Sequence, residues 1–330
     1  MILNGKAPAS IAAAADALAA GQLVGLPTET VYGLAADAGS EAAVRRIFAA
    51  KGRPADHPLI VHVAGAGQVL RFADAVPDFA QALIEAFWPG PLTLILPRRA
   101  GVAEVAAGGQ ATIGLRCPSH PVARALLAAC AVRGIHGLAA PSANRFGRVS
   151  PTTAAHVAAE FGDQLLVLDG GPCQVGIEST IVDCTRGAPV LLRPGQVGRA
   201  EIERVSGQRM LSKDELDAPD PRASGTLASH YAPRARLRLM DASELHAALR
   251  RLRADDGASL AVWARTPLPP APGVLLHRMP DGAEAAAREL FAVLRAFDDA
   301  GAELIWIETP PDAPDWEGVR DRLQRAAAPT

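Results

Sequence analysis

The stretch EAAVRRIFAAKGRPADHPLIVHV, residues 41–63, decides much of the fold. Ser40 precedes it as a candidate helix cap, and apolar residues at 44, 47 and 48 share one helix face, so the pattern predicts a helix over residues 41–50. Lys51, Gly52, Arg53 and Pro54 follow that helix, and residues 58–63 are predicted to form a strand. Two cations thus stand between a helix and a strand. They either complement the negative end of the helix dipole or bind the oxygens of a polyphosphate.

Small polar residues follow other predicted strands in the same way. Residues 28–30 (Thr, Glu, Thr) follow a strand predicted at 22–26, and Ser142 and Asn144 follow one at 137–140. Their hydroxyls and amides either cap turns or bind a small polar ligand. Ser150 precedes Pro151 at the start of a helix, an arrangement that suits phosphate binding as well as plain capping.

A strand predicted at residues 112–116 carries Thr112 and Arg116 on one face, because side chains four apart on a strand point the same way. An arginine in an apolar strand needs a partner, so Arg116 is a candidate for binding a carboxylate. His57 and His62 bracket a strand and point to different faces, which disfavours a metal pair. Glu178, Ser179 and Thr180 precede one further strand, and Arg193 follows another.

The order of elements predicts two α/β domains. Residues 1–206 form a mixed domain with about seven strands, and residues 207–233 read as a linker because they are charged and proline-rich. Residues 234–330 alternate strands and helices, which predicts a small parallel sheet covered by helices. The seven strands of the first domain are predicted at 22–26, 58–63, 92–96, 112–116, 137–140, 165–168 and 180–183.

The amino-acid composition and the motifs that are absent exclude several classes of function. The 330 residues carry 33 Lys and Arg against 35 Asp and Glu, a net charge of −2, so no global positive field favours nucleic acid. The four cysteines are far apart, as in a cytosolic protein with reduced thiols. No run reaches the roughly 18 apolar residues that cross a bilayer, so we expect no membrane association and a cytoplasmic location. The P-loop, dinucleotide-binding and G-x-S-x-G motifs are absent from the sequence.

Six ordered motifs together resemble the YrdC/Sua5 family of threonylcarbamoyl-AMP synthases. They are PTETVYGLAADA from Pro27, KGRPADHPLIVHV from Lys51, FWPGPLTLIL from Phe87, TIGLRCP from Thr112, APSANRFGRVSPT from Ala140 and ESTIVDC from Glu178. SHYAP from Ser229 and the domain after it are similar to the longer, two-domain Sua5 form. The resemblance implies a YrdC-like twisted mixed sheet with flanking helices, joined to a smaller Rossmann-like C-terminal domain with a parallel sheet.

The resemblance also implies a reaction. L-threonine, bicarbonate and ATP, with Mg²⁺, would give threonylcarbamoyl-AMP and pyrophosphate, and the product would supply a tRNA threonylcarbamoyl transferase complex through a transient contact. A weak contact with tRNA itself is also expected. The residues implied by motif form three overlapping groups. Thr30, His62, Arg116, Ala140 and Thr180 would bind threonine; Arg53, His57, Thr112, Ser142, Ser150, Arg193 and Tyr231 would bind ATP; and Lys51 and Arg53 would be the catalytic cations at its phosphates.

His57 stands where the family commonly has Asn, and Phe146 replaces a small residue. The ATP contact of His57 could therefore depend on pH. Tyr231 falls in the linker, which predicts that the linker forms a lid.

Two other functions are compatible with such a chain. One is an RNA-binding, translation-associated module without synthetic activity, although the near-neutral charge and the absence of basic and aromatic interleaving disfavour it. The other is carbamoyl transfer in hydrogenase maturation, but relatives of that kind carry acylphosphatase and zinc-finger segments that this chain lacks.

Overall fold

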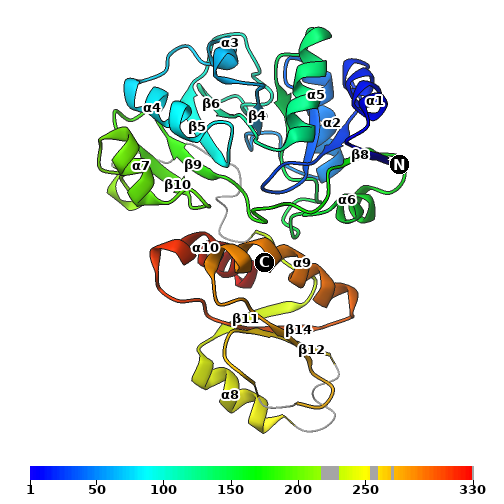
Figure 1. Cartoon of the computed structure of the whole chain (residues 1–330), viewed down its shortest axis with the longest axis vertical. Coiled ribbons are helices and arrows are strands. Elements are labelled where there is room, and N and C mark those ends of the chain that lie inside the picture. The colour runs from blue at the N-terminus through cyan, green and yellow to red at the C-terminus, as the bar shows by residue number, and fades with distance from the viewer. Residues whose placement is uncertain (217–229, 253–258, 269–270, 329–330) are drawn as a thin grey trace. The chain divides into compact units, whose positions relative to one another are not determined.

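The computed structural model describes residues 1–216, 230–252, 259–268 and 271–328. It divides into two compact units, residues 1–146 with 150–226, and residues 147–149 with 227–330 (Figure 1). The central part of the predicted linker, residues 217–229, lies outside the described residues.

The first unit is built on one mixed sheet of ten strands in the order β1-β8-β2-β3-β7-β4-β6-β5-β9-β10. Parallel and antiparallel pairs both occur: β4 runs parallel to β6, whereas β5 runs antiparallel to β6. The strands are β1 Ile2–Asn4, β2 Val24–Leu26, β3 Gly33–Asp37, β4 Ile60–His62, β5 Leu92–Pro97, β6 Thr112–Arg116, β7 Leu138–Ala139, β8 Leu166–Asp169, β9 Thr180–Asp183 and β10 Val190–Arg193.

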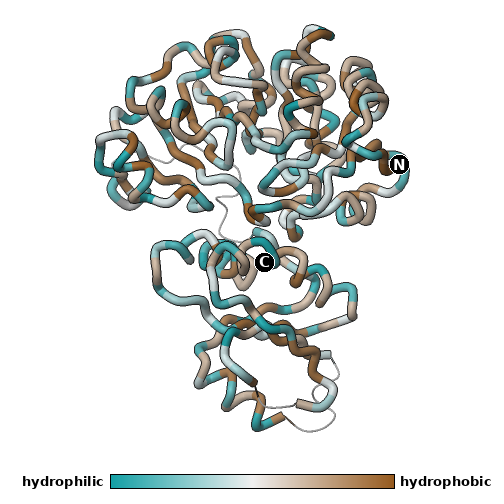
Figure 2. Tube along the Cα trace, in the orientation of Figure 1, coloured by the Kyte–Doolittle hydropathy of each residue, from teal (hydrophilic) through white to brown (hydrophobic). Residues whose placement is uncertain are grey.

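Helices cover this sheet, with α1 packed beside α5 and α4 beside α7 (Figure 1). In Figure 2 hydrophobic and hydrophilic segments alternate along the helices, as expected for amphipathic helices on a sheet. The helices are α1 Pro8–Ala19, α2 Glu41–Lys51, α3 Val69–Phe72, α4 Asp78–Phe87, α5 Pro121–Val132, α6 Ala154–Phe161 and α7 Arg199–Ser206, with 3₁₀ turns at Ala66–Gln68 and Lys213–Glu215.

Two large hydrophobic clusters form the core of the first unit. One buries the inner faces of α1 and α5, including Leu18 and Leu126, against β2. The other buries α2 and α4, including Ile47 and Leu83, against the middle of the sheet. Each such side chain contributes roughly 1.5–3 kcal/mol when fully buried. The core thereby fixes the strand ends from which the polar residues project.

The mixed fold is confirmed, but the count of about seven strands is too low. Strands β1 and β3 are additional, and β10 is the strand expected next to Arg193 but left out of the seven. β1 has three residues and no alternating pattern, and β3 reads GLAAD, whose small side chains lack the β-branched and aromatic residues typical of strands. The residues after β10 also contribute: Leu211 bridges to Val190, so the chain packs on the first unit at this point.

The second unit contains a four-stranded sheet in the order β11-β14-β12-β13, and every pair in it is parallel. This confirms the predicted parallel sheet. β13 had no sequence signal because all four of its residues are exposed. The elements are β11 Arg236–Met240, α8 Ala242–Arg251, β12 Leu260–Ala264, β13 Leu275–Arg278, α9 Ala283–Asp299, β14 Leu304–Glu308, a 3₁₀ turn Pro314–Trp316 and α10 Glu317–Ala327.

Among the described residues no helix combines the length and hydropathy needed to cross a membrane.

Candidate functional site

The loop after β2 forms the first wall of the site. Thr28 Oγ1 donates to the carbonyl oxygen of Val31 at 2.6 Å and lies 2.9 Å from Thr30 Oγ1, which closes a tight turn. Thr28, Glu29 and Thr30 are all buried. The turn therefore presents a carboxylate and a hydroxyl inside the protein rather than to solvent.

Arg116, at the end of β6, is the centre of the site. Its Nη1 donates to Thr30 Oγ1 at 2.8 Å, and its Nε donates to the carbonyl oxygen of Gly90 at 3.2 Å. Its Nη2 lies 2.6 Å from Glu29 Oε1, and both side chains are about 95% buried. The sequence predicted a carboxylate partner for Arg116, and within the chain that partner is Glu29.

Charge keeps this pair ionised. Burial by itself would raise the pKa of the Glu29 carboxyl, but the charge and hydrogen bonding of Arg116, together with the backbone amides of Glu29 and Ser119, outweigh burial and hold that pKa below its usual value. Neither carboxylate oxygen of Glu29, nor Nη2 of Arg116, makes an aligned hydrogen bond within the part of the chain that the structure describes. Buried charged atoms in this state can still accept or donate hydrogen bonds to a ligand.

His62 extends the same site from the neighbouring strand. It is the register partner of Arg116 in the pair β4–β6 and is 3% exposed. Burial, assisted by the charge of Arg116, lowers the pKa of His62 from 6.5 to about 3, so the imidazole is neutral at physiological pH. Its Nδ1 has no hydrogen-bond partner among the described residues. A neutral imidazole suits recognition of a hydroxyl or an amine.

The lowered pKa of His62 predicts a pH dependence of stability. The unfolded chain takes up a proton at His62 near pH 6.5, whereas the folded chain does so only near pH 3. The free energy of unfolding should therefore be highest above pH 6.5 and fall as the pH drops below it. Urea unfolding between pH 7 and pH 5 should show a steeper fall for the wild type than for His62→Asn. Equal slopes in the two proteins would contradict a buried neutral His62.

Lys51 ends α2, and local sequence explains its position. Ser40 caps the helix start by accepting from the amide of Ala43, and Gly52 adopts the left-handed conformation that ends it. The Lys51 side chain is 3% exposed, and its Nζ donates to the carbonyl oxygens of Ser142 at 2.6 Å and Asn144 at 2.5 Å. Burial, followed by the charge of Arg53, lowers the pKa of Lys51 well below its usual value. Lys51 thus ties the loop after β7 to the helix.

Arg53 and His57 lie together beyond that helix. The Arg53 guanidinium stacks over the ring of Phe146, 5.7 Å from its centroid, and its Nη2 donates to the carbonyl oxygen of Pro58 at 2.9 Å. The His57 ring meets the edge of Phe146 at 5.6 Å. Phe146, the unusual residue in its motif, is therefore the surface on which both predicted ATP ligands pack.

Residues 178–180 and Arg193 form a second wall of the site, in addition to the loop after β2. Ser150 donates to Glu178 Oε1 at 2.5 Å, and Arg193 donates through Nε to the carbonyl oxygen of Ser179 at 3.0 Å. The Thr180 hydroxyl donates to the carbonyl oxygen of Val197 at 2.9 Å, and its amide donates to the carbonyl oxygen of Pro91. Pro91 adjoins Gly90, which accepts from Arg116, so this wall is continuous with the arginine.

Gly195 allows this wall to close. A Cβ at this position would lie 2.5 Å from the amide nitrogen of Thr180 and 2.9 Å from the carbonyl oxygen of Glu178, closer than such atoms approach. We expect Gly195→Ala to displace both residues and to lower kcat/KM by about tenfold or more, the order that a sub-ångström displacement produces. Gly198→Ala is the matched control, because a Cβ there meets nothing within 4 Å. Equal activity of the two variants would show that the close approach has no role.

Three further predicted residues are placed as follows. Thr112 begins β6, and four residues of a strand place it about 13 Å from Arg116. Tyr231 belongs to the second unit, where its ring lies 5.4 Å from Phe291 and is 1% exposed. Ala140 is buried at the end of β7, where its amide donates to the carbonyl oxygen of Ile60.

The sequence did not identify Glu29 as the partner of Arg116, nor the role of Phe146 as a packing surface for Arg53. Glu29 had a local signal, because an acidic residue between two threonines directly follows a buried strand. The pairing itself depends on tertiary contact.

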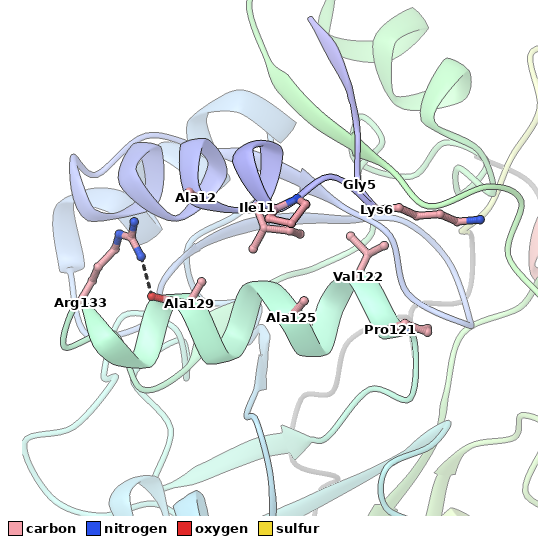
Figure 3. Close-up of a pocket in the computed structure, with 10 residues that line it drawn as sticks. Gly5, Lys6, Ile11, Ala12, Pro121, Val122, Ala125, Ala129 and Arg133 are labelled. Atoms are coloured by element: carbon pink, nitrogen blue, oxygen red, sulfur yellow. Dashed lines mark hydrogen bonds between the residues drawn. The ribbon is translucent and has the colours of Figure 1, made fainter.

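A separate groove lies between α1 and α5, with a volume of about 480 Å³ (Figure 3). Its lining is mostly apolar and includes Ile11, Val122 and Ala125, with Lys6 near one end and Arg133 near the other. None of the predicted site residues lines it.

Comparison with family models matches both parts of the chain. Residues 16–195 match the Sua5/YciO/YrdC family, described as "Telomere recombination". Residues 197–328 match the family described as "Threonylcarbamoyl-AMP synthase, C-terminal domain".

Proteins named as threonylcarbamoyl-AMP synthases align with the chain over almost its full length. A threonylcarbamoyl-AMP synthase of Pyrococcus abyssi is 38% identical over 95% of this chain and 93% of its own. One of Bacillus subtilis is 37% identical over 96% of this chain and 92% of its own. The solved structure of P. abyssi Sua5 complexed with L-threonine is 36% identical, with a TM-score of 0.89 over 99% of this chain and 97% of that one.

Proposed function

Because the chain belongs to the Sua5/YrdC family, we propose that it is a threonylcarbamoyl-AMP synthase that joins L-threonine, bicarbonate and ATP. The reaction class is nucleotidyl transfer, with threonylcarbamoyl-AMP and pyrophosphate as products. The observation that carries the proposal is the buried constellation of Arg116, Thr30, Glu29 and His62, which offers a guanidinium, a hydroxyl, a carboxylate and a neutral imidazole to one small ligand.

In this proposal Arg116 binds the carboxylate of threonine, which a guanidinium fork recognises well. Thr30 supports it through the hydrogen bond to Nη1, and His62 faces the substrate from the adjacent strand. Thr180 and the backbone at Ala140 complete the threonine subsite. A relative with 36% identity is known in complex with L-threonine, which supports this ligand.

ATP would occupy the side of the site that holds the buried cations. Arg53, His57, Thr112, Ser142, Ser150 and Arg193 are the proposed contacts. Lys51 would place its charge near the phosphates while it holds the Ser142–Asn144 loop in place. Tyr231 remains a proposed ATP ligand and lid residue.

Catalysis would consist mainly of positioning and charge neutralisation. The threonine ammonium group gives one proton to bicarbonate, which releases water and CO₂. The neutral amine nitrogen then bonds to the carbon of CO₂ and releases a second proton to solvent, which yields a carbamate. A carbamate oxygen then bonds to the α-phosphorus of ATP as the bond to the bridging oxygen breaks and pyrophosphate leaves. Lys51 and Arg53 would neutralise the charge that develops on the phosphates.

The proposed reaction uses Mg²⁺, which would bind together with ATP. In the described part of the chain no group of three or more His, Cys, Asp or Glu could hold a metal ion. At nucleotides Mg²⁺ is usually bound chiefly by phosphate oxygens and water. When bound, it would add positive charge at the triphosphate.

We further propose that the product passes to a tRNA threonylcarbamoyl transferase complex through transient contact, with at most a weak contact to tRNA. A cytoplasmic location accords with the four cysteines, which are all buried free thiols.

Pyrophosphate release tests the proposal. Purified protein with ATP, Mg²⁺, L-threonine and bicarbonate should release pyrophosphate, and omission of either threonine or bicarbonate should reduce the rate to background. ATP left unchanged in the complete mixture, by protein shown to be folded, would favour the RNA-binding alternative.

A further inference from the structure

We propose that Glu29 is the residue that binds the α-ammonium group of the amino-acid substrate, so that the Glu29–Arg116 pair recognises both charges of an α-amino acid. This inference rests on the proposed function, because it assigns a role within the same threonine site. Glu29 is a positioning and specificity residue in this account.

The first support is the state of the Glu29 carboxylate. Glu29 is 4% exposed, and although the Arg116 guanidinium and the backbone amides of Glu29 and Ser119 lie near its carboxylate, neither oxygen makes an aligned hydrogen bond among the described residues. Its backbone is fixed, because its carbonyl oxygen accepts from the amide of Val175 at 2.8 Å. A buried carboxylate on a rigid backbone, with unused acceptor capacity, is poised to receive N–H donors from a ligand.

The second support is the pattern of donors that Arg116 has already used. Nε is bound to Gly90 and Nη1 to Thr30, whereas Nη2 faces Glu29 Oε1 at 2.6 Å without an aligned hydrogen bond. The acidic and the basic group that remain available are therefore direct neighbours. In an α-amino acid the carboxylate and the ammonium are attached to one carbon, and so are also neighbours. β- and γ-amino acids separate the two charges and fit this spacing less well.

The third support is charge balance. Buried charges are tolerated when they are paired, and an unpaired one is costly. Glu29 and Arg116 have no net charge together, and neither has a zwitterion, so binding leaves every buried charge opposite a partner. A 2-hydroxy acid or an N-acylated amino acid would bring one negative charge and leave Glu29 uncompensated. The site should therefore select α-amino acids with a free amino group.

The same argument limits the chemistry of Glu29. Burial opposes ionisation, but Arg116 holds the pKa of Glu29 below its usual value, which makes this carboxylate a weak base. Glu29 would hold and orient the amino group and would not remove its proton.

The Kd values of the Glu29→Gln variant for two ligands distinguish binding of the substrate ammonium group from a purely structural role of Glu29. The variant keeps the shape of the side chain and removes its charge. By calorimetry, the Kd for L-threonine should increase by about 30-fold or more, the usual result of truncating one side of a buried charge pair. The Kd for 3-hydroxybutanoate, which is threonine without its amino group, should fall, because the variant no longer leaves a buried negative charge uncompensated beside this anion. Equal weakening of both ligands would overturn the proposal, because it would show only that Arg116 had moved.

The pH dependence of binding gives a second readout that does not need the analogue. For the wild type, affinity for L-threonine should fall as the pH rises through the pKa of the substrate amine, because the ammonium charge is lost. The variant should lack that fall, and an unchanged fall would overturn the proposal.

Glu308→Gln is the matched control. Glu308 is also a buried glutamate paired with an arginine, with Oε1 2.8 Å from Arg265, but it lies in the second unit. The Kd of Glu308→Gln for L-threonine and its Kd for 3-hydroxybutanoate should both equal those of the wild type. These are binding measurements, so a protein that binds threonine as described and yet makes no adenylate would refute the proposed function and leave the role of Glu29 intact.

Discussion

Arg116→Ala is expected to reduce kcat/KM for L-threonine by about 30-fold to 5000-fold. Loss of the guanidinium removes the partner of the substrate carboxylate, and truncation of a buried, hydrogen-bonded charge pair costs about 2–5 kcal/mol. It also leaves the Glu29 carboxylate buried without its counter-charge, which costs stability as well. Steady-state kinetics with threonine varied at saturating ATP would measure the effect, and the KM for ATP should change far less.

Two further variants separate binding from folding. Arg116→Lys keeps the charge opposite Glu29 but cannot form the two-pronged contact, so it should fold and still show a raised KM for threonine. Arg265→Ala breaks the comparable buried pair with Glu308 in the second unit and should lower stability without a change in the KM for threonine. An unchanged KM for threonine in Arg116→Lys and Arg116→Ala would remove Arg116 from the substrate site.

Lys51→Met is expected to lower kcat by about 100-fold or more. The methionine retains the apolar stem of the side chain but removes the donors to the carbonyl oxygens of Ser142 and Asn144. Buried acceptors left without donors cost about 1–3 kcal/mol each, so the loop should move away from its position beside ATP. The positive charge proposed to act at the phosphates is lost at the same time. Pyrophosphate release at saturating substrates is the measurement.

Arg45→Met is the control for this change, since it removes a cation from the same helix. The Arg45 side chain is 63% exposed and pairs with Glu41 on the surface, so kcat should be unchanged and stability altered by less than about 1 kcal/mol. Equal kcat values for Lys51→Met and the wild type would contradict both the anchoring role and the catalytic role of Lys51.

Several parts of the site were predictable because their causes are local. Ser40 and Gly52 set the ends of α2 and thereby the position of Lys51, and both are visible in the sequence. Arg116 lies within an apolar strand, and burial of a guanidinium requires a partner. Such local rules predicted the mixed sheet and the parallel C-terminal sheet, whereas the shared ligand of Thr30 and Arg116 was implied by the family resemblance.

The rest depends on contacts between residues that are distant in sequence. Glu29 and Arg116 meet only after β2 and β6 have taken their places in the sheet, so no spacing in the chain reveals the pair. Lys51 was predicted beside phosphate, and its hydrogen bonds to the loop at Ser142 became visible only in the fold. β13 was missed for a different reason, since an exposed strand lacks the alternation of buried residues on which the prediction depends.

Isotope transfer into the adenylate tests the central claim most directly. Protein is incubated with ATP, Mg²⁺, L-threonine and ¹³C-bicarbonate. The nucleotides are then separated by chromatography, and the mass of each is measured by mass spectrometry. The account predicts a threonylcarbamoyl-AMP species that carries the label, forms together with pyrophosphate, and is absent for Arg116→Ala. If folded wild-type protein produces no labelled adenylate, or if an adenylate forms without label, the proposed synthase reaction is wrong.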